Sequence, residues 1–351
     1  MKESFIVQKG SFMTSHATIY REEMENGIAL YHLENREIRL TLTNVGCAIV
    51  KLEVRDRYGE FRDVVLGFDK LEKYRSNTTY FGAIVGRIAG KVVPASFRWR
   101  GKTVQLSHDA ENVHLHGGEG AISFRDWDAK IQGDALQFHI HSSDGDNGYP
   151  GDMDIQVIYR LEDHGVCLTY QAWADKCTPV NLIAHPYFNL NGHDSGSVLG
   201  HKLCLKAATF NDTEAPWPRS ARIYACEEYP AYDFRELKRF AQEQYDCNYI
   251  LSKDGSADAT LYAEESGILL QVSCTQPCMQ LYTACETHET GKGGVQYHPY
   301  DAVCLEAQHF PNAVNIPDVE TPHTDPGGCY RQEVHYIFSA AQSLAHTDDR
   351  R

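Results

Sequence analysis

Apolar and polar residues alternate with a period of two along most of this chain. The alternation is clear in segments 38–42 and 50–54 and recurs in segments 136–140, 155–161, 166–170, 268–272 and 330–338. In an extended chain this period places every second side chain on one face. These segments are therefore predicted to be half-buried β-strands.

Short turn sequences separate the central strands, which predicts a meander. Gly133-Asp134 and Asp163-His164-Gly165 provide these turns. Segment 234–244 (FRELKRFAQEQ) is the best helix candidate, because its apolar residues are spaced for one helical face. No Pro/Ser-rich linker or long repeat divides the chain. We expect an all-β fold, a large antiparallel β-sandwich with few short helices, as one domain over residues 1–351.

Composition narrows the possible partners and the location of the protein. The 351 residues carry a formal net charge of −15, which opposes binding to nucleic acid or to anionic membranes. There is neither a secretory leader pattern nor a long apolar run, so we expect a cytoplasmic protein that is a monomer or homodimer. The eleven cysteines contain no C-x-x-C pair and are expected to be reduced, mostly buried thiols.

Two segments combine glycines with residues that an ordinary strand does not need. Arg87 ends the apolar segment 80–87, and a buried guanidinium requires either a structural partner or a polar binding site. His114 and His116 would share one face of a strand, and the two following glycines leave room for a ligand. Such a pair can bind a ligand or a metal, or can serve neither purpose.

Two further segments place an ionisable residue among apolar neighbours. His185 interrupts the apolar and aromatic segment 178–190, where it could be a tuned acid or a core histidine bonded to a backbone carbonyl. Glu306 follows four apolar or weakly polar residues, and a carboxylate there is seldom buried without a partner or a function. A surface glutamate on an edge strand is the alternative. A cupin-like metal site formed by His114, His116, His185 and Glu306 also competes.

Six motifs in the same order resemble the aldose 1-epimerase (galactose mutarotase) family over about residues 20–340. They are YFGAIVGRIAGKV from Tyr80, HLHGG from His114, GYPGDMDIQVIYRL from Gly148, TPVNLIAHPYFNLNG from Thr178, the loop at Tyr245-Asp246-Cys247-Asn248, and LEAQHFPNAVN from Leu305. The resemblance implies the large antiparallel supersandwich of this family, and it implies interconversion of the α and β anomers of a free aldohexose such as galactose or glucose.

The resemblance also implies roles for individual residues. Glu306 would be the general base and His185 the general acid. The sugar hydroxyls would be bound by Arg87, His116, Asp246 and Gln308. No metal or other cofactor is required, because ring opening and reclosure need only proton transfer.

Four departures from the family pattern lie beside these residues. Gly90-Lys91 replaces the usual Asn-Arg pair, Val113 stands where Asn often precedes the L-H-G-G motif, Cys247 replaces a common His, and Pro186 follows His185. They leave the choice of sugar open. A non-catalytic sugar-binding protein and the cupin-like metalloenzyme are the alternatives from other classes, whereas a phosphosugar epimerase would need more basic residues than this acidic chain offers.

Overall fold

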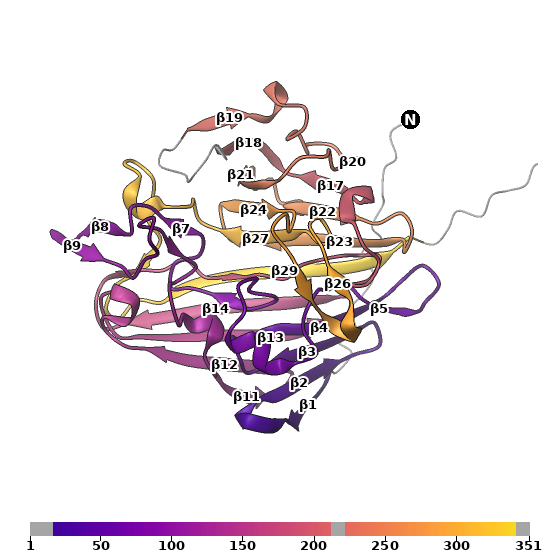
Figure 1. Ribbon diagram of the computed structural model, residues 1–351, viewed down its shortest axis with the longest axis horizontal. Helices are drawn as coiled ribbons and strands as arrows, with labels where there is room; N and C mark the ends of the chain where they lie inside the picture. Colours follow the sequence, from indigo (N-terminus) through magenta and orange to yellow (C-terminus); the bar gives the residue numbers. More distant parts are fainter. Residues whose placement is uncertain (1–16, 212–221, 342–351) are drawn as a thin grey trace, which may run out of the picture.

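A computed structural model describes residues 17–211 and 222–341 of the chain. Over these residues the chain forms β-strands joined by turns and short 3-10 helices, and no α-helix is present among them (Figure 1). None of these 3-10 helices is long and apolar enough to cross a membrane. The predicted all-β class is confirmed.

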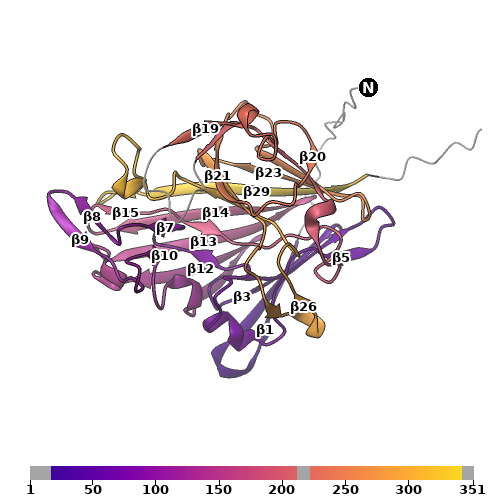
Figure 2. The same cartoon turned by 45° about the horizontal axis from the view of Figure 1, so that its top comes forward.

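The largest element is a nine-stranded antiparallel sheet. In spatial order its strands are β11 (Asp128–Gln132), β12 (Ala135–Ser142), β13 (Met153–Glu162), β14 (Gly165–Ala174), β29 (Tyr330–Ala340), β23 (Ile268–Cys274), β22 (Ala259–Tyr262), β17 (Lys202–Leu205) and β20 (Lys238–Arg239). The C-terminal strand β29 lies between β14 and β23 (Figure 2). The expected meander is thus extended across the molecule by a strand that is remote in sequence.

Two five-stranded antiparallel sheets lie at opposite ends of the view in Figure 1. The first contains β1 (Thr18–Glu23), β2 (Ala29–Glu34), β3 (Ile38–Thr43), β4 (Ile49–Arg55) and β5 (Phe61–Asp63). The second, called here the site sheet, has the spatial order β19 (Ile223–Ala225), β18 (Ala207–Asn211), β21 (Asp246–Leu251), β24 (Cys278–Tyr282) and β27 (Cys304–Gln308). Phe188 links the chain next to the two sheets, because it forms isolated bridges to Val65, which follows β5, and to Val303, which precedes β27.

One apolar core joins all three sheets. It contains Leu40 of β3, Tyr159 of β13 and Leu305 of β27, each fully buried. Phe188 packs its ring against Tyr336 of β29 with the centroids 5.4 Å apart. Burying each large apolar side chain contributes about 1.5–3 kcal/mol, so the alternation seen in the sequence directly drives the packing of the layers.

Short paired segments and 3-10 helices complete the described part of the chain. The paired strands are β6 (Ile84–Val85) with β16 (Ile183–Ala184), β7 (Lys91–Val92) with β10 (His114–Leu115), β8 (Ser96–Trp99) with β9 (Lys102–Gln105), β15 (Thr178–Pro179) with β28 (His323–Thr324), and β25 (Glu289–Thr290) with β26 (Gln296–Tyr297). The 3-10 helices are η1 (Glu25–Gly27), η2 (Leu71–Arg75), η3 (Ile122–Phe124), η4 (Asp146–Gly148), η5 (Val198–Gly200), η6 (Cys226–Glu228), η7 (Lys292–Gly294) and η8 (Ala313–Asn315).

The predicted helix over 234–244 is wrong. Phe234 and Phe240 are buried as a helical face would require, but Leu237, between them on that face, is 37% exposed. Instead, the carbonyl of Phe234 accepts a hydrogen bond from Leu205 N at 2.7 Å, and β20 adds to the edge of the nine-stranded sheet. Burial of both phenylalanine rings against Tyr245 outweighs the helix propensity of the segment.

The cysteines behave as expected from the sequence. All eleven are free thiols, and six of them are buried. The absence of C-x-x-C spacing therefore correctly indicated a fold that does not depend on disulfides.

Candidate active site

The outer face of the site sheet is polar. Leu281 and Leu305 point into the core, whereas Gln280 and Glu306, which are directly paired across β24 and β27, lie on the opposite face. Asn248 of β21 continues this row, because it pairs with Gln280. The same period-two alternation that builds the core thus lines the other face with hydrogen-bonding groups.

His185 reaches this face from a different part of the chain. It follows β16, which packs next to β27, and its backbone is fixed by hydrogen bonds with Gly82 and Ala83, each 3.0 Å long. Its Nε2 lies 3.5 Å from Oε1 of Glu306. His185 is 4% exposed and Glu306 is 3% exposed. The structure therefore brings together two ionisable residues that are far apart in sequence.

Aromatic rings hold the imidazole of His185 in place. Tyr187 stacks on it at a centroid distance of 5.0 Å, and the ring of Tyr80 is nearly parallel to it at 6.3 Å. His116 and Tyr282 meet it edge to face, at 5.5 and 6.5 Å. Nδ1 of His185 is buried without a hydrogen-bond partner. The ring orientation is thus set by packing.

Burial controls the protonation of the pair. It raises the pKa of Glu306 well above its usual value, an effect that Asp246 reinforces and Lys91 opposes. Burial also lowers the pKa of His185 to about 4, partly offset by Asp246. Both changes favour neutral side chains, the state in which the pair holds a single exchangeable proton on Glu306. Transfer of that proton between the two residues, directly or through a ligand, converts the pair from neutral to ionic.

A more exposed ion pair lies beside the buried pair. Nζ of Lys91 is 3.3 Å from Oδ2 of Asp246, and their side chains are 28% and 47% exposed. The amide nitrogen of Gln280 donates to Oδ1 of Asp246 at 2.7 Å. Both charges act on the protonation of Glu306, so this ion pair belongs electrostatically to the same site.

Gln308 and His116 complete the polar surroundings. Gln308 is 2% exposed, and its Nε2 donates to Oδ1 of Asn248 at 2.9 Å and to Oε1 of Gln280 at 3.1 Å. Nδ1 of His116 accepts from the backbone N–H of Gly90 at 3.2 Å, which places the proton of the neutral ring on Nε2. Burial lowers the pKa of His116 well below its usual value. The ring therefore offers Nε2–H as a neutral donor.

The backbone after His116 explains the two glycines that follow it. His116 itself has a φ of 49°, and Gly117 has a φ of 90°. A Cβ on Gly117 would lie 1.8 Å from the carbonyl oxygen of Gly86. The turn is therefore accessible only to glycine, and it directs His116 toward His185.

The hydrogen bonds of Arg87 do not support the predicted sugar contact. The guanidinium of Arg87 donates to the hydroxyl and carbonyl oxygens of Ser142 and to the carbonyl oxygens of Ser143, Pro150 and Gly151. These five bonds use all of its N–H donors, and the residue is 2% exposed. Arg87 therefore fastens β12 to the turn that precedes β13.

Lys91 is the basic residue that sequence reasoning did not assign to the site. It stands in the Gly90-Lys91 pair that departs from the family pattern, four residues after Arg87, and it contacts Asp246. The departure itself was the available signal. Arg87, which follows a glycine, was expected to contact the sugar, whereas the basic residue beside the buried pair of His185 and Glu306 is Lys91.

The structure also separates His114 from His116. His114 lies on β10 and is buried, with Nδ1 2.6 Å from the carbonyl of Ser107 and Nε2 2.6 Å from the hydroxyl of Tyr149. His116 lies beyond the end of β10, so the two rings do not share one strand face. Neither His114 nor His116 belongs to a group of three or more possible metal ligands in the described part of the chain, so the cupin-like set of four ligands is not brought together there.

A smaller group of possible metal ligands exists within the site. Ligand atoms of His185, Cys304 and Glu306 lie within 4.8 Å of one another, and all three residues are buried. Burial raises the pKa of Cys304 well above its usual value, and the negative charge of Glu306 adds to this effect. The thiol is therefore kept neutral, which disfavours its use as a metal ligand.

Solved structures share this fold. A GalM/aldose epimerase homologue from C. elegans superposes with a TM-score of 0.82 and 25% identity, covering 93% of this chain and 99% of that one. Galactose 1-epimerase from Lactobacillus acidophilus gives a TM-score of 0.79 at 22% identity, covering 93% and 100%. By fold, the chain is thus one of the galactose mutarotase-like β-sandwich proteins.

Sequence comparison is more specific. The aldose 1-epimerase family model matches residues 29–337. Galactose mutarotase from Homo sapiens is 34% identical over 325 residues, covering 89% of this chain and 94% of the relative. Aldose 1-epimerase from Escherichia coli is 30% identical over 331 residues, covering 87% and 93%. The chain belongs to the aldose 1-epimerase family and is an isomerase.

Proposed function

We propose that this chain is a mutarotase that interconverts the α and β anomers of a free aldohexose such as galactose or glucose. The observation that carries the proposal is the buried pair of Glu306 and His185, whose Oε1 and Nε2 atoms are 3.5 Å apart. Anomer exchange needs one group to remove a proton from the C1 hydroxyl while another protonates the ring oxygen. Family membership supports the same reaction.

The two protonation states of the pair match the two halves of the reaction. Ionised Glu306 removes the proton of the C1 hydroxyl, protonated His185 gives its proton to the ring oxygen, and the C1–O5 bond breaks to give the open-chain aldehyde. The pair is then neutral, which is the state that burial favours. Rotation about C1–C2 presents the other face of the carbonyl, and reclosure reverses both proton transfers.

The surrounding polar groups would hold the sugar through its hydroxyls. Nε2–H of His116 is a donor, Asp246 is an acceptor, and Gln308 has an amide fixed by neighbouring amides. We assign the role of the basic sugar-binding residue to Lys91 rather than to Arg87, because Lys91 lies beside Asp246 and affects the protonation of Glu306. These groups must retain the open-chain intermediate while it rotates.

Other properties remain predictions that accompany this function. We expect one domain over residues 1–351, a monomer or homodimer in the cytoplasm, and no requirement for a cofactor. Activity that persists after exhaustive chelation would exclude the cupin-like alternative. Saturable sugar binding without faster optical change would instead indicate a non-catalytic sugar-binding protein.

The variant Glu306→Gln tests the catalytic assignment. Glutamine keeps the shape of the side chain but cannot accept the proton, so kcat/KM should fall by about 10²- to 10⁴-fold, the usual contribution of a general acid–base group. Polarimetry of freshly dissolved α-D-galactose and α-D-glucose measures the rate after subtraction of the spontaneous reaction. Glu265→Gln, at an exposed position, is the matched control. Near-normal turnover by a folded E306Q protein would remove Glu306 from the mechanism.

A further inference from the structure

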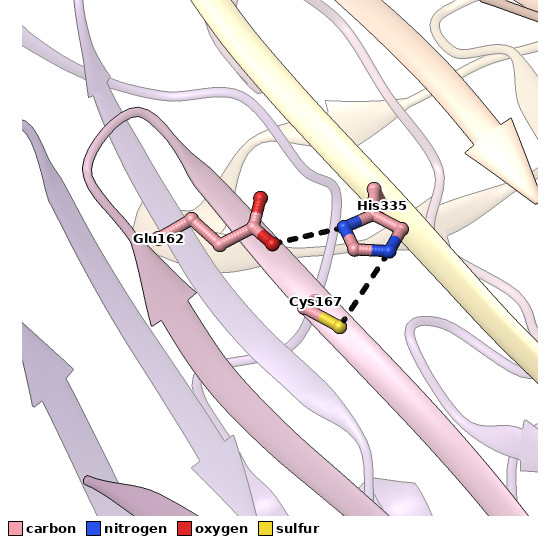
Figure 3. A group of neighbouring side chains, drawn as sticks. All are labelled: Glu162, Cys167 and His335. Atoms are coloured by element: carbon pink, nitrogen blue, oxygen red, sulfur yellow. Dashed lines mark hydrogen bonds and ion pairs between the residues drawn. The ribbon is translucent and has the colours of Figure 1, made fainter. Parts of the chain in front are cut away.

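A second cluster of ionisable side chains lies on the nine-stranded sheet (Figure 3). Glu162 is the last residue of β13, Cys167 lies on β14, and His335 of β29 is directly paired with Cys167. Their neighbours Leu161, Val166 and Tyr336 point into the core, so the cluster is on the opposite face of the sheet. It shares no residue with the proposed catalytic site.

The cluster has short internal distances. Nδ1 of His335 is 3.0 Å from Oε1 of Glu162, and Nε2 is 3.9 Å from Sγ of Cys167. One ligand atom from each of the three residues can be chosen so that all lie within 4.8 Å of one another. Ligands of a tetrahedral zinc ion, with bonds of about 2.0–2.3 Å, are separated by about 3.3–3.7 Å. Ligand atoms within 4.8 Å of one another are thus at most about 1.5 Å farther apart than in a formed site.

We propose that Glu162, Cys167 and His335 form a binding site for a thiophilic divalent transition metal ion of the Zn²⁺ type. Thiolate, imidazole and carboxylate are the three ligand types of protein zinc sites. Nδ1 of His335, which faces Glu162, would bind the ion, and Nε2 of the same ring lies 2.9 Å from Oε1 of Glu333. A carboxylate that holds the other ring nitrogen in this way orients a ligating histidine.

Access and local charge are compatible with this occupant. Cys167 is 7% exposed, but the side chains of His335 and Glu162 are 30% and 37% exposed, so an ion can reach the cluster from solvent. On binding, the metal takes the place of the thiol proton of Cys167 and of the proton that Nδ1 of His335 shares with Glu162, and both protons pass to solvent. Glu162, Glu333 and the thiolate then carry three negative charges, which offset the two positive charges of the ion and that of Arg331, 3.4 Å from Glu333.

A comparable cluster elsewhere lacks this charge balance. Cys177, His323 and Asp325 also offer three ligand atoms within 4.8 Å. However, Arg100 donates to Sγ of Cys177 at 3.1 Å and lies 3.4 Å from Oδ1 of Asp325. A guanidinium in contact with two of the three ligands repels a divalent cation, so this cluster serves as the control.

Titration of the metal-stripped full-length protein with Co²⁺ tests the proposal. We expect thiolate-to-cobalt charge-transfer absorption in the wild-type protein and in the controls Cys177→Ser and Cys304→Ser, but none in Cys167→Ser. Glu333→Gln should bind about 10- to 100-fold more weakly, as is typical when the partner of a ligating histidine is lost. Loss of the absorption in Cys304→Ser would show that the ion is bound between His185 and Glu306 instead. Mutarotation by Cys167→Ser should equal that of the wild-type protein.

Thermal unfolding provides a second measurement. Zn²⁺ should raise the Tm of the wild-type protein and leave the Tm of Cys167→Ser and Glu162→Gln unchanged, because a ligand stabilises only a fold that binds it. If either variant unfolds at the assay temperature, the other decides the result. Equal cobalt absorption in Cys167→Ser and the wild-type protein, or no thiolate–cobalt absorption at all, would overturn the proposal. The cluster would then be an ion-pair arrangement only.

Discussion

The acid side of the pH–activity profile follows from the shared proton of Glu306 and His185. The pair is active while it holds one proton, because a second proton leaves no base. The second proton is taken up by His185, whose pKa burial lowers from 6.5 to about 4. This change corresponds to about 3 kcal/mol against the imidazolium. Activity should therefore persist to a lower pH than an exposed histidine would allow.

The magnitude is large enough to measure. At pH 5.5, a group with a pKa of about 4 leaves about 97% of the pair in the active state, whereas a pKa of 6.5 would leave about 9%. We therefore expect kcat/KM to change little between pH 7.5 and pH 5.5. The profile reports the free enzyme, which is the state that the structure describes.

Polarimetry at a series of pH values, with the spontaneous rate subtracted at each, makes this measurement. Circular dichroism at each pH and recovery of activity on return to pH 7.5 control for unfolding. A tenfold loss of kcat/KM by pH 5.5 in a folded protein would refute the reasoning, because it would mean that His185 titrates as if it were exposed.

Two further predictions concern the basic residues. Lys91→Met should lower kcat/KM at pH 7 by roughly tenfold, since a hydrogen bond from a charged group contributes about 1.5 kcal/mol. The loss of activity at high pH should move to a higher pH in this variant, because Lys91 lowers the pKa of Glu306. Lys91→Arg should recover the activity, and an unchanged rate and pH profile in Lys91→Met would contradict the assignment. Arg87→Met should reduce the free energy of unfolding in urea by on the order of 3–5 kcal/mol, because it leaves several buried oxygens unpaired, whereas exposed Arg98→Met should not. The KM of folded Arg87→Met should stay near normal, and a large rise would restore Arg87 to the sugar site.

Much of the fold could be predicted from local pattern. Segments 38–42 and 155–161 became β3 and β13, because alternation suits a sheet with one buried face. The same reasoning failed at 234–244, where residue types that favour a helix were compatible with burying Phe234 and Phe240 in extended chain. A short amphipathic pattern does not distinguish these outcomes without knowledge of what it packs against.

The amino-acid sequence by itself determined the strand-rich fold class, the family and the two residues proposed for proton transfer, because alternation and motif order are properties of the chain. Tertiary structure alone decided which basic residue lies beside the buried pair. Arg87 is satisfied by oxygens 55 to 64 residues away, and Lys91 meets Asp246 across 155 residues. A donor is taken up by whichever acceptors the fold brings within about 3 Å, and those acceptors are not visible in the local sequence.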